Sequence, residues 1–285
     1  MEVERSLTGQ PEKFKARAVY LLPVLASILF GMLCATLLLK PTPSSPPVYP
    51  VTPISQTSSE GPLFNALYFL IIVAAGATLM YLLIRYRSRR TISFLTGFAL
   101  TAAFLLLGFI YFYTLLSQFS DYLPIVIVLS VLIAVLGDLA IFRFGGKLSD
   151  AVVLGLGGAL GVFLGANLNV YTSVLILVCL ALFDIYAVYR GPIGKIATSG
   201  MDQLKGLSFS FKEIQMGLGD LVFYSVLTGT MFINYSLTAC LFSVAGILIG
   251  SYLTFLALER REVFPGLPLP LGLGIVLGVL AGIFL

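Results

Sequence analysis

Nine long apolar stretches constrain what this chain can fold into more than any other feature of its sequence. Only 11% of the residues are charged, whereas a soluble domain carries about 25%. Each stretch has close to the ~20 residues that an α-helix needs to cross the hydrocarbon core of a bilayer. They cover residues 18–39, 63–84, 92–116, 123–142, 150–167, 171–189, 217–233, 237–258 and 267–285. We therefore predict an all-α, polytopic membrane protein with nine transmembrane helices.

The basic residues between these stretches predict how the chain lies across the membrane. Cytoplasmic loops of membrane proteins carry an excess of Lys and Arg. With the N-terminus inside, the cytoplasmic segments hold all seventeen Lys and Arg residues except Lys40. Removing one span would reverse every later loop and destroy this pattern. We therefore predict a cytoplasmic N-terminus and an extracytoplasmic C-terminus.

Two connections and one helix face have a distinctive composition. Residues 41–62 are rich in Pro, Ser and Thr, which predicts an extended outer loop. Residues 190–216 form the longest cytoplasmic connection, in which residues 208–211 alternate polar and aromatic side chains as a short strand does. Glycines recur every four residues at positions 157, 161 and 165, which predicts a face for close helix packing. We expect no separate soluble domain.

Histidine and cysteine usage narrows the possible chemistry. The sequence contains no histidine, so histidine-based triads and metal sites are excluded. Cys34, Cys179 and Cys240 lie inside apolar stretches, at no metal-ligand or disulfide spacing. We therefore predict no metal site and no cofactor, and we expect the lipid bilayer rather than nucleic acid as a partner.

Two carboxylates inside apolar stretches are the candidate functional residues. An ionisable group at such a depth costs at least a few kcal/mol and marks a functional site by default. Asp184 lies six residues before Arg190, and Asp220 lies eight residues after Lys212. On helices both acids would lie roughly 9–12 Å from the same membrane surface. Because the two helices run in opposite directions, Asp184 and Asp220 can face each other across one water molecule.

The surroundings of these acids differ from those of a third acid. Gly217 and Gly219 precede Asp220, and they would let another backbone come close and loosen the start of the helix. Asp138 also follows a glycine and lies five residues before Arg143. We expect Asp138 to lie near the interface, paired with a nearby basic group.

A pair of nearby carboxylates supports two kinds of function. Because like charges repel, one acid keeps its proton while the other ionises. The ionised acid can then take a proton from water while the protonated acid hydrogen-bonds a carbonyl group, which is aspartic peptide hydrolysis. The same pair could form the proton or sodium relay of a transporter. The spacing of the acids alone leaves both functions open.

Three short segments resemble motifs of the presenilin and signal-peptide-peptidase family of intramembrane aspartyl proteases. Residues 183–189 (FDIYAVY) resemble the tyrosine-aspartate motif of the sixth helix, with Phe183 in place of the tyrosine. Residues 217–227 (GLGDLVFYSVL) resemble the glycine-x-glycine-aspartate (GxGD) motif of the seventh helix. Residues 265–268 (PGLP) resemble the proline-alanine-leucine motif of the ninth helix, with Gly266 in place of the alanine. The motifs fall in the right order on spans six, seven and nine, and the likeness covers about residues 171–285.

The resemblance implies an aspartic-type intramembrane endopeptidase that hydrolyses peptide bonds of single-span transmembrane substrates. It makes Asp184 and Asp220 the catalytic pair. It implies substrate-binding roles for Gly217, Leu218, Gly219, Pro265, Gly266, Leu267 and Pro268. It also divides the chain into a scaffold of helices 1–5 (residues 1–167) and catalytic helices 6–9 (residues 168–285).

The compact chain resembles archaeal members of the family, which implies the plasma membrane of a microbe. A cation- or proton-coupled transporter, or a leak channel that uses the same acids, is the alternative.

Overall fold

The computed structural model describes residues 15–39, 52–55, 58, 60–86, 89–119, 122–189, 206–211, 214–260 and 264–284. The N-terminal tail to residue 14, most of the outer loop 41–62, and residues 190–205 of the long cytoplasmic connection lie outside the described residues. The predictions made for those segments are therefore untested.

The described residues form nine helices, as predicted. They are α1 (Leu22–Leu38), α2 (Gly61–Arg85), α3 (Arg89–Leu116), α4 (Tyr122–Asp138), α5 (Gly146–Ala166), α6 (Val170–Tyr189), α8 (Leu218–Asn234), α9 (Leu237–Arg260) and α10 (Pro268–Phe284). A short 3₁₀ helix, η1 (Ala18–Leu21), leads into α1, and a π-helix, η2 (Leu139–Phe144), continues α4.

Seven of these helices, with η1 and η2 counted as parts of α1 and α4, are long and apolar enough to cross a membrane. The other two, α8 and α10, are apolar and slightly shorter. The chain is therefore an integral membrane protein. Its orientation in the membrane stays a prediction from the basic residues.

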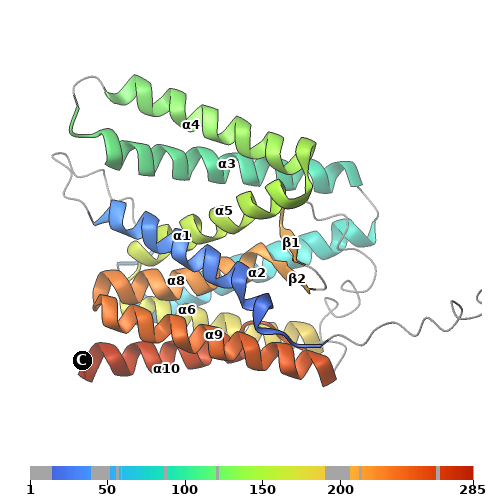
Figure 1. Cartoon of the computed structure of the whole chain (residues 1–285), viewed down its shortest axis with the longest axis vertical. Coiled ribbons are helices and arrows are strands. Elements are labelled where there is room, and N and C mark those ends of the chain that lie inside the picture. Colours follow the sequence, from blue (N-terminus) through green and yellow to red (C-terminus); the bar gives the residue numbers. More distant parts are fainter. Residues whose placement is uncertain are drawn as a thin grey trace, which may run out of the picture.

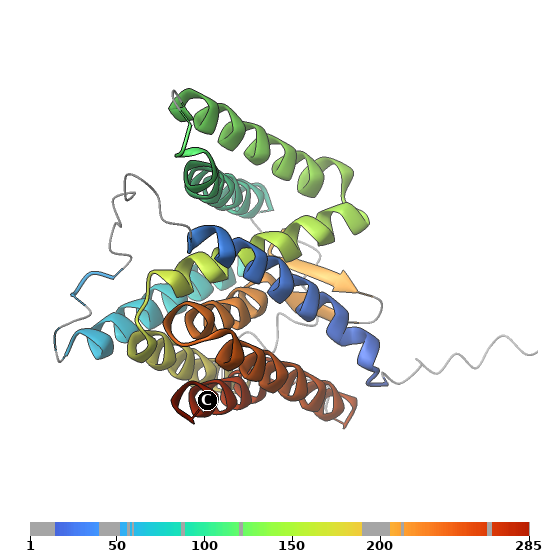
Figure 2. The ribbon, with the colours of Figure 1, turned by 60° about the vertical axis from the view of Figure 1, so that its left-hand side comes forward.

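The helices are arranged as a bundle with an outlying pair (Figures 1 and 2). Helices α3 and α4 pack on each other at one side of the molecule, while α6, α8, α9 and α10 lie together at the other side. Between them, α1 packs on α5 and α5 packs on α8, and α2 packs on α6. One hydrophobic core runs through both halves of the chain, with Val24, Leu100, Leu221 and Leu271 among its members.

The glycine face of α5 packs tightly on α8, as its spacing predicted. A Cβ atom at Gly161 would overlap the carbonyl oxygen of Val222, and one at Gly165 would lie 2.5 Å from the carbonyl oxygen of Val226. Since only glycine leaves room for this approach, these positions hold α8 close to α5.

A two-stranded hairpin precedes α8. The predicted strand is confirmed as β1 (Ser208–Phe211), and it pairs antiparallel with β2 (Ile214–Gly217), so that Ser208 faces Gly217. The sequence prediction treated residues 212–216 as loop and so missed β2. The Leu218 N–H donates to the Leu207 carbonyl oxygen at 2.7 Å and carries the pairing to the first residue of α8.

The hairpin is anchored in the helix bundle. Phe209 is 2% exposed and belongs to the main core. Gly206, which precedes β1, has a φ of +83° and lies against Leu100 of α3 and Ile141 of η2. The position of β2, and therefore the start of α8, is set by these contacts.

Candidate active site

Asp220 lies in the first turn of α8, where local structure favours an acid. Gly217 is the residue that caps the helix, with extended backbone angles (φ −76°, ψ 146°), and Asp220 is the third residue inside the helix. The positive end of the helix dipole stabilises an anion at this position.

Asp184 lies in the last two turns of α6 and is held from another part of the chain. The backbone N–H of Leu267 donates to Asp184 Oδ2 at 3.0 Å. This donor is free for the contact because Leu267 precedes the first turn of α10.

The segment 265–268 touches both acids. A Cβ atom built on Gly266 would lie 3.3 Å from Asp220 Oδ2, so the glycine backbone passes directly beside that carboxylate. The two carboxylates are close enough for their charges to interact. Pro268 starts α10, a position that suits proline because no N–H is needed there. The sequence-predicted acids and the segment 265–268 are therefore brought together.

Tyr224 completes this arrangement and was not singled out from the sequence. It follows Asp220 by one helical turn, is 1% exposed, and donates from its hydroxyl to the Gly266 carbonyl oxygen at 3.0 Å. This hydrogen bond connects α8 to the segment whose Leu267 amide donates to Asp184 on α6. The spacing of four residues from Asp220 was the one signal in the sequence that could have identified it.

The residues predicted to bind substrate fall into two groups, glycines that border open space and leucines whose side chains are buried. A Cβ atom at Gly217 would meet only the Gly219 nitrogen at 3.9 Å, and one at Gly219 only the Phe223 ring at 3.8 Å, among the described residues. These two glycines therefore border open space, unlike the packed glycines of α5. Leu218 and Leu267 are 8% and 6% exposed and belong to the core, so they offer a partner their backbone rather than their side chains.

Both short helices begin at the site. With 17 residues each, α8 and α10 extend about 25 Å, which is less than the hydrocarbon thickness of about 30 Å. Non-helical backbone precedes both helices, strand β2 before α8 and the irregular residues 264–267 before α10. Such backbone is tolerated at membrane depth only where protein buries it or water reaches it. Asp184 and Asp220 are half-buried and Gly219 is exposed, which fits backbone that water can reach.

Asp138 lies apart from this site, at the end of α4. Its Oδ2 accepts a hydrogen bond from the Thr101 hydroxyl at 2.6 Å. We expected a basic partner, but the hydrogen-bonding partner is a neutral side chain on α3. The reason is that α3 and α4 pack side by side and bring Thr101 to the level of Asp138.

Residues 195–285 match the Presenilin family model. Presenilin-B of Dictyostelium discoideum is 27% identical over 163 residues, which are 53% of this chain and 34% of that protein. The matched region thus spans about one third of the length of this relative.

Two solved structures of a presenilin family intramembrane aspartate protease share the fold. The one in space group C222 superimposes with a TM-score of 0.66 at 20% identity and covers 93% of this chain and 99% of that chain. The one in space group P2 has a TM-score of 0.63 at 22% identity, with coverages of 94% and 99%.

The described residues therefore form a polytopic membrane protein with the fold of these two solved structures. The C-terminal third of the chain is in addition similar in sequence to presenilins.

Proposed function

We propose that the chain is an intramembrane aspartic endopeptidase in which Asp184 and Asp220 form the catalytic pair. One observation carries the proposal: residues 266 and 267 contact both carboxylates, through the Leu267 N–H on Asp184 and the Gly266 backbone against Asp220. Acids that served only to pack helices would not need a shared segment of extended backbone beside open space.

The proposed reaction uses one proton shared by the pair. The ionised carboxylate takes a proton from water as the water oxygen bonds to the peptide carbonyl carbon. The protonated carboxylate gives its proton to the carbonyl oxygen, which yields a gem-diol. When the gem-diol collapses, the carboxylate that is now ionised takes a proton from one of the two hydroxyl groups. The other carboxyl gives the proton that it took from water to the nitrogen, and the C–N bond breaks. The new carboxyl and amino ends leave, and the pair again holds one proton. Because the acids are coupled, the pair titrates as a unit.

The hairpin supports a proposal for how a transmembrane substrate is held. A helix must unwind before its peptide bonds can be reached, and each backbone group without a partner in an apolar setting costs several kcal/mol. The described sheet has only two strands, so β2 keeps one edge without a strand partner. We propose that unwound substrate pairs with β2 and is clamped against residues 265–268, with Gly217 and Gly219 allowing close approach.

Two further parts of the proposal rest on likeness and pattern alone. Residues 1–167 would act as the scaffold and residues 168–285 would supply the catalytic helices. The membrane would be the plasma membrane of a microbe, because the compact chain resembles archaeal members of the family.

The test of the catalytic pair is cleavage of a labelled single-span peptide by the purified protein, with product masses measured directly. Asp184→Asn and Asp220→Asn should each lower turnover by at least about a hundredfold, because an amide cannot exchange the proton. Asp138→Asn is the matched control on a different helix and should leave turnover unchanged. Near-normal turnover in either of the first two variants would overturn the assignment.

The same variants distinguish the alternative function. A cation-coupled transporter or leak channel would show ion flux in sealed vesicles that disappears in Asp184→Asn and Asp220→Asn, without any peptide cleavage by the unmodified protein. An endopeptidase would show cleavage that these variants lose.

A further inference from the structure

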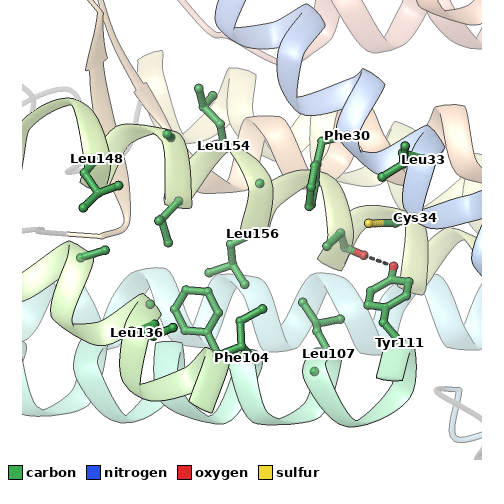
Figure 3. Close-up of a pocket in the computed structure, with 18 of the residues that line it drawn as sticks. Phe30, Leu33, Cys34, Phe104, Leu107, Tyr111, Leu136, Leu148, Leu154 and Leu156 are labelled. Carbon is green, nitrogen blue, oxygen red and sulfur yellow. Dashed lines mark hydrogen bonds between the residues drawn. The ribbon is translucent and has the colours of Figure 1, made fainter. Parts of the chain in front are cut away.

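An apolar cavity of about 800 Å³ lies between α1, α3, α4, η2 and α5 (Figure 3). Leu136 and Leu148 lie at one end of it, and Cys34 and Tyr111 lie at the other. None of the proposed catalytic or substrate-binding residues lines it. A void of this size is unusual, because protein interiors pack with few voids larger than a water molecule.

The cavity has a buried floor and an exposed rim. The floor includes Phe104, Leu107 and Leu156, each 8% exposed or less. The rim includes Leu33, Phe144 and Leu148, each more than half exposed. The cavity therefore opens on the outer surface of the helices, which in a membrane protein faces lipid.

The lining offers almost nothing for a polar ligand. The Tyr111 hydroxyl is already used, because it donates to the Ala159 carbonyl oxygen at 2.8 Å. The other lining residue with a polar atom in its side chain is Cys34, whose thiol is a weak hydrogen-bonding group. An occupant must therefore be a hydrocarbon along most of its length.

The volume of the cavity selects among hydrocarbon occupants. A transmembrane helix of 20 residues, about 30 Å long and 10 Å across, fills roughly 2,400 Å³. The cavity holds about a third of that volume, so it cannot enclose a helix of a substrate or of a second copy. A volume of 300–1,000 Å³ is the usual range for a small ligand, and the lipid chains of the bilayer are the small apolar molecules that surround the rim.

Two basic residues lie where the headgroup of such a lipid would be. Arg143 and Lys147 are exposed, flank the turn from η2 to α5, and directly precede Phe144 and Leu148, which line the cavity. Gly145 and Gly146 make this turn sharp by adopting φ values of +64° and +58°. Because the turn joins two membrane helices, it lies at a membrane surface, in the layer of lipid phosphates.

Asp138 and Asp150 lie near the same turn, so the four formal charges sum to zero. The two acids are half-buried, however, whereas Arg143 and Lys147 are exposed. The basic side chains are therefore the ones that face the headgroup layer. We propose that the cavity binds a hydrocarbon chain of an anionic phospholipid whose phosphate lies beside Arg143 and Lys147.

The chain-binding part is tested with a phosphatidylglycerol probe that carries a photoreactive group in its acyl chain. The protein is reconstituted in phosphatidylcholine vesicles containing this probe, and the labelled residues are mapped by mass spectrometry. We expect labels on the segment from Phe104 to Phe112. Gly155→Leu should reduce them about tenfold by filling the cavity, since a Cβ at Gly155 meets only the Phe30 ring, at 3.6 Å or more.

The matched control is Gly76→Leu on α2, where a Cβ meets nothing within 4 Å. This variant should keep the labelling of the unmodified protein. Equal labelling in Gly155→Leu, with thermal unfolding unchanged, would overturn the proposal. Loss of labelling on addition of a single-span peptide, or cross-links between two copies through these residues, would identify a helix as the occupant and would also overturn it.

The proposed role of Arg143 and Lys147 is tested by comparing two lipid probes that differ only in their headgroup. A phosphatidylglycerol probe should label the cavity about fivefold more than the same probe with a phosphatidylcholine headgroup. The double variant Arg143→Gln, Lys147→Gln should remove that preference and keep the remaining labelling. Equal labelling by both probes in the unmodified protein would overturn the role of the two basic residues. These measurements need no peptide cleavage, so their outcome is independent of the proposed protease function.

Discussion

At the scale of residues, the site depends on backbone groups as much as on carboxylates. Leu267 donates its amide to Asp184, and Gly266 accepts from Tyr224 through its carbonyl oxygen. One peptide segment thus connects an acid of α6 with the helix that carries Asp220. Tyr224 lies at the centre of this arrangement, and its hydroxyl is a positioning group rather than a reacting one.

Removing the Tyr224 hydroxyl should therefore lower both the activity and the stability of the protein. Tyr224→Phe should lower the free energy of unfolding by about 1–2 kcal/mol, because a buried carbonyl oxygen loses its donor. It should lower kcat/KM about tenfold, since a small displacement of residues 266 and 267 misplaces Asp184. Peptide cleavage and thermal unfolding of the purified variant measure the two effects.

Ser173→Ala is the control for Tyr224→Phe. This substitution removes another buried hydroxyl contact between α6 and α8, the 3.0 Å hydrogen bond between Ser173 and Thr230. Ser173 lies eleven residues before Asp184 on α6. A similar loss of stability with unchanged cleavage is the expected result. Equal losses of activity in both variants would mean that Tyr224 acts only through overall stability.

At the scale of elements, glycines set how close the helices come and where they stop being helical. The face of α5 at Gly161 and Gly165 is filled by the backbone of α8. On α9, a Cβ at Gly250 would lie 2.5 Å from the Leu269 carbonyl oxygen at the start of α10. These contacts position the two short helices whose first residues, Leu218 and Pro268, adjoin the site.

Adding a single methyl group to the glycine face of α5 should lower the stability of the protein if α5 and α8 pack this closely. Gly161→Ala should destabilise the protein by about 1–3 kcal/mol through overpacking, although alanine favours a helix over glycine by about 1 kcal/mol. Gly76→Ala, in open space on α2, should be neutral or stabilising. Unfolding in mixed detergent with SDS measures both. Equal stability of the two variants would argue against tight α5–α8 contact.

The proposed pairing of substrate with β2 predicts a dependence on substrate helicity. Single-span peptides with Gly-Gly around the cleaved bond should be cut about tenfold faster than those with Leu-Leu, because two glycines weaken the local helix by about 1–2 kcal/mol. Product formation for such a peptide series is the measurement. If both peptides were cut at the same rate, the clamp would be wrong while the catalytic pair could still be right.

At the scale of the whole molecule, the distribution of basic residues predicts how the bundle is oriented in the membrane. All Lys and Arg residues except Lys40 lie on the side predicted to be cytoplasmic, and both acids lie nearer to that side. The proposed reaction would therefore take place in the cytoplasmic half of the membrane.

Labelling from each side of sealed vesicles tests this orientation. In a variant without the native cysteines, Lys205→Cys should react only with reagent on the cytoplasmic side, and Pro50→Cys only with reagent on the outer side. The physical reason is the excess of basic residues in cytoplasmic loops. Labelling of position 205 from outside alone would reverse the proposed topology.

The sequence by itself determined the helices, because crossing a bilayer depends on a local property, the length of an apolar run. The nine predicted spans match the nine helices of the described residues to within a few residues. The three motifs also singled out Asp184, Asp220 and the segment 265–268 before any contact between them was known.

Only the tertiary structure decided which backbone atoms meet these acids. Leu267 and Asp184 are 83 residues apart, and Tyr224 and Gly266 are 42 apart, so no periodicity in the sequence relates them. Strand β2, the hydrogen bond of Tyr224 and the cavity beside α5 were missed for the same reason. Each depends on how helices pack against one another, and packing is a property of surfaces from distant segments rather than of any one segment.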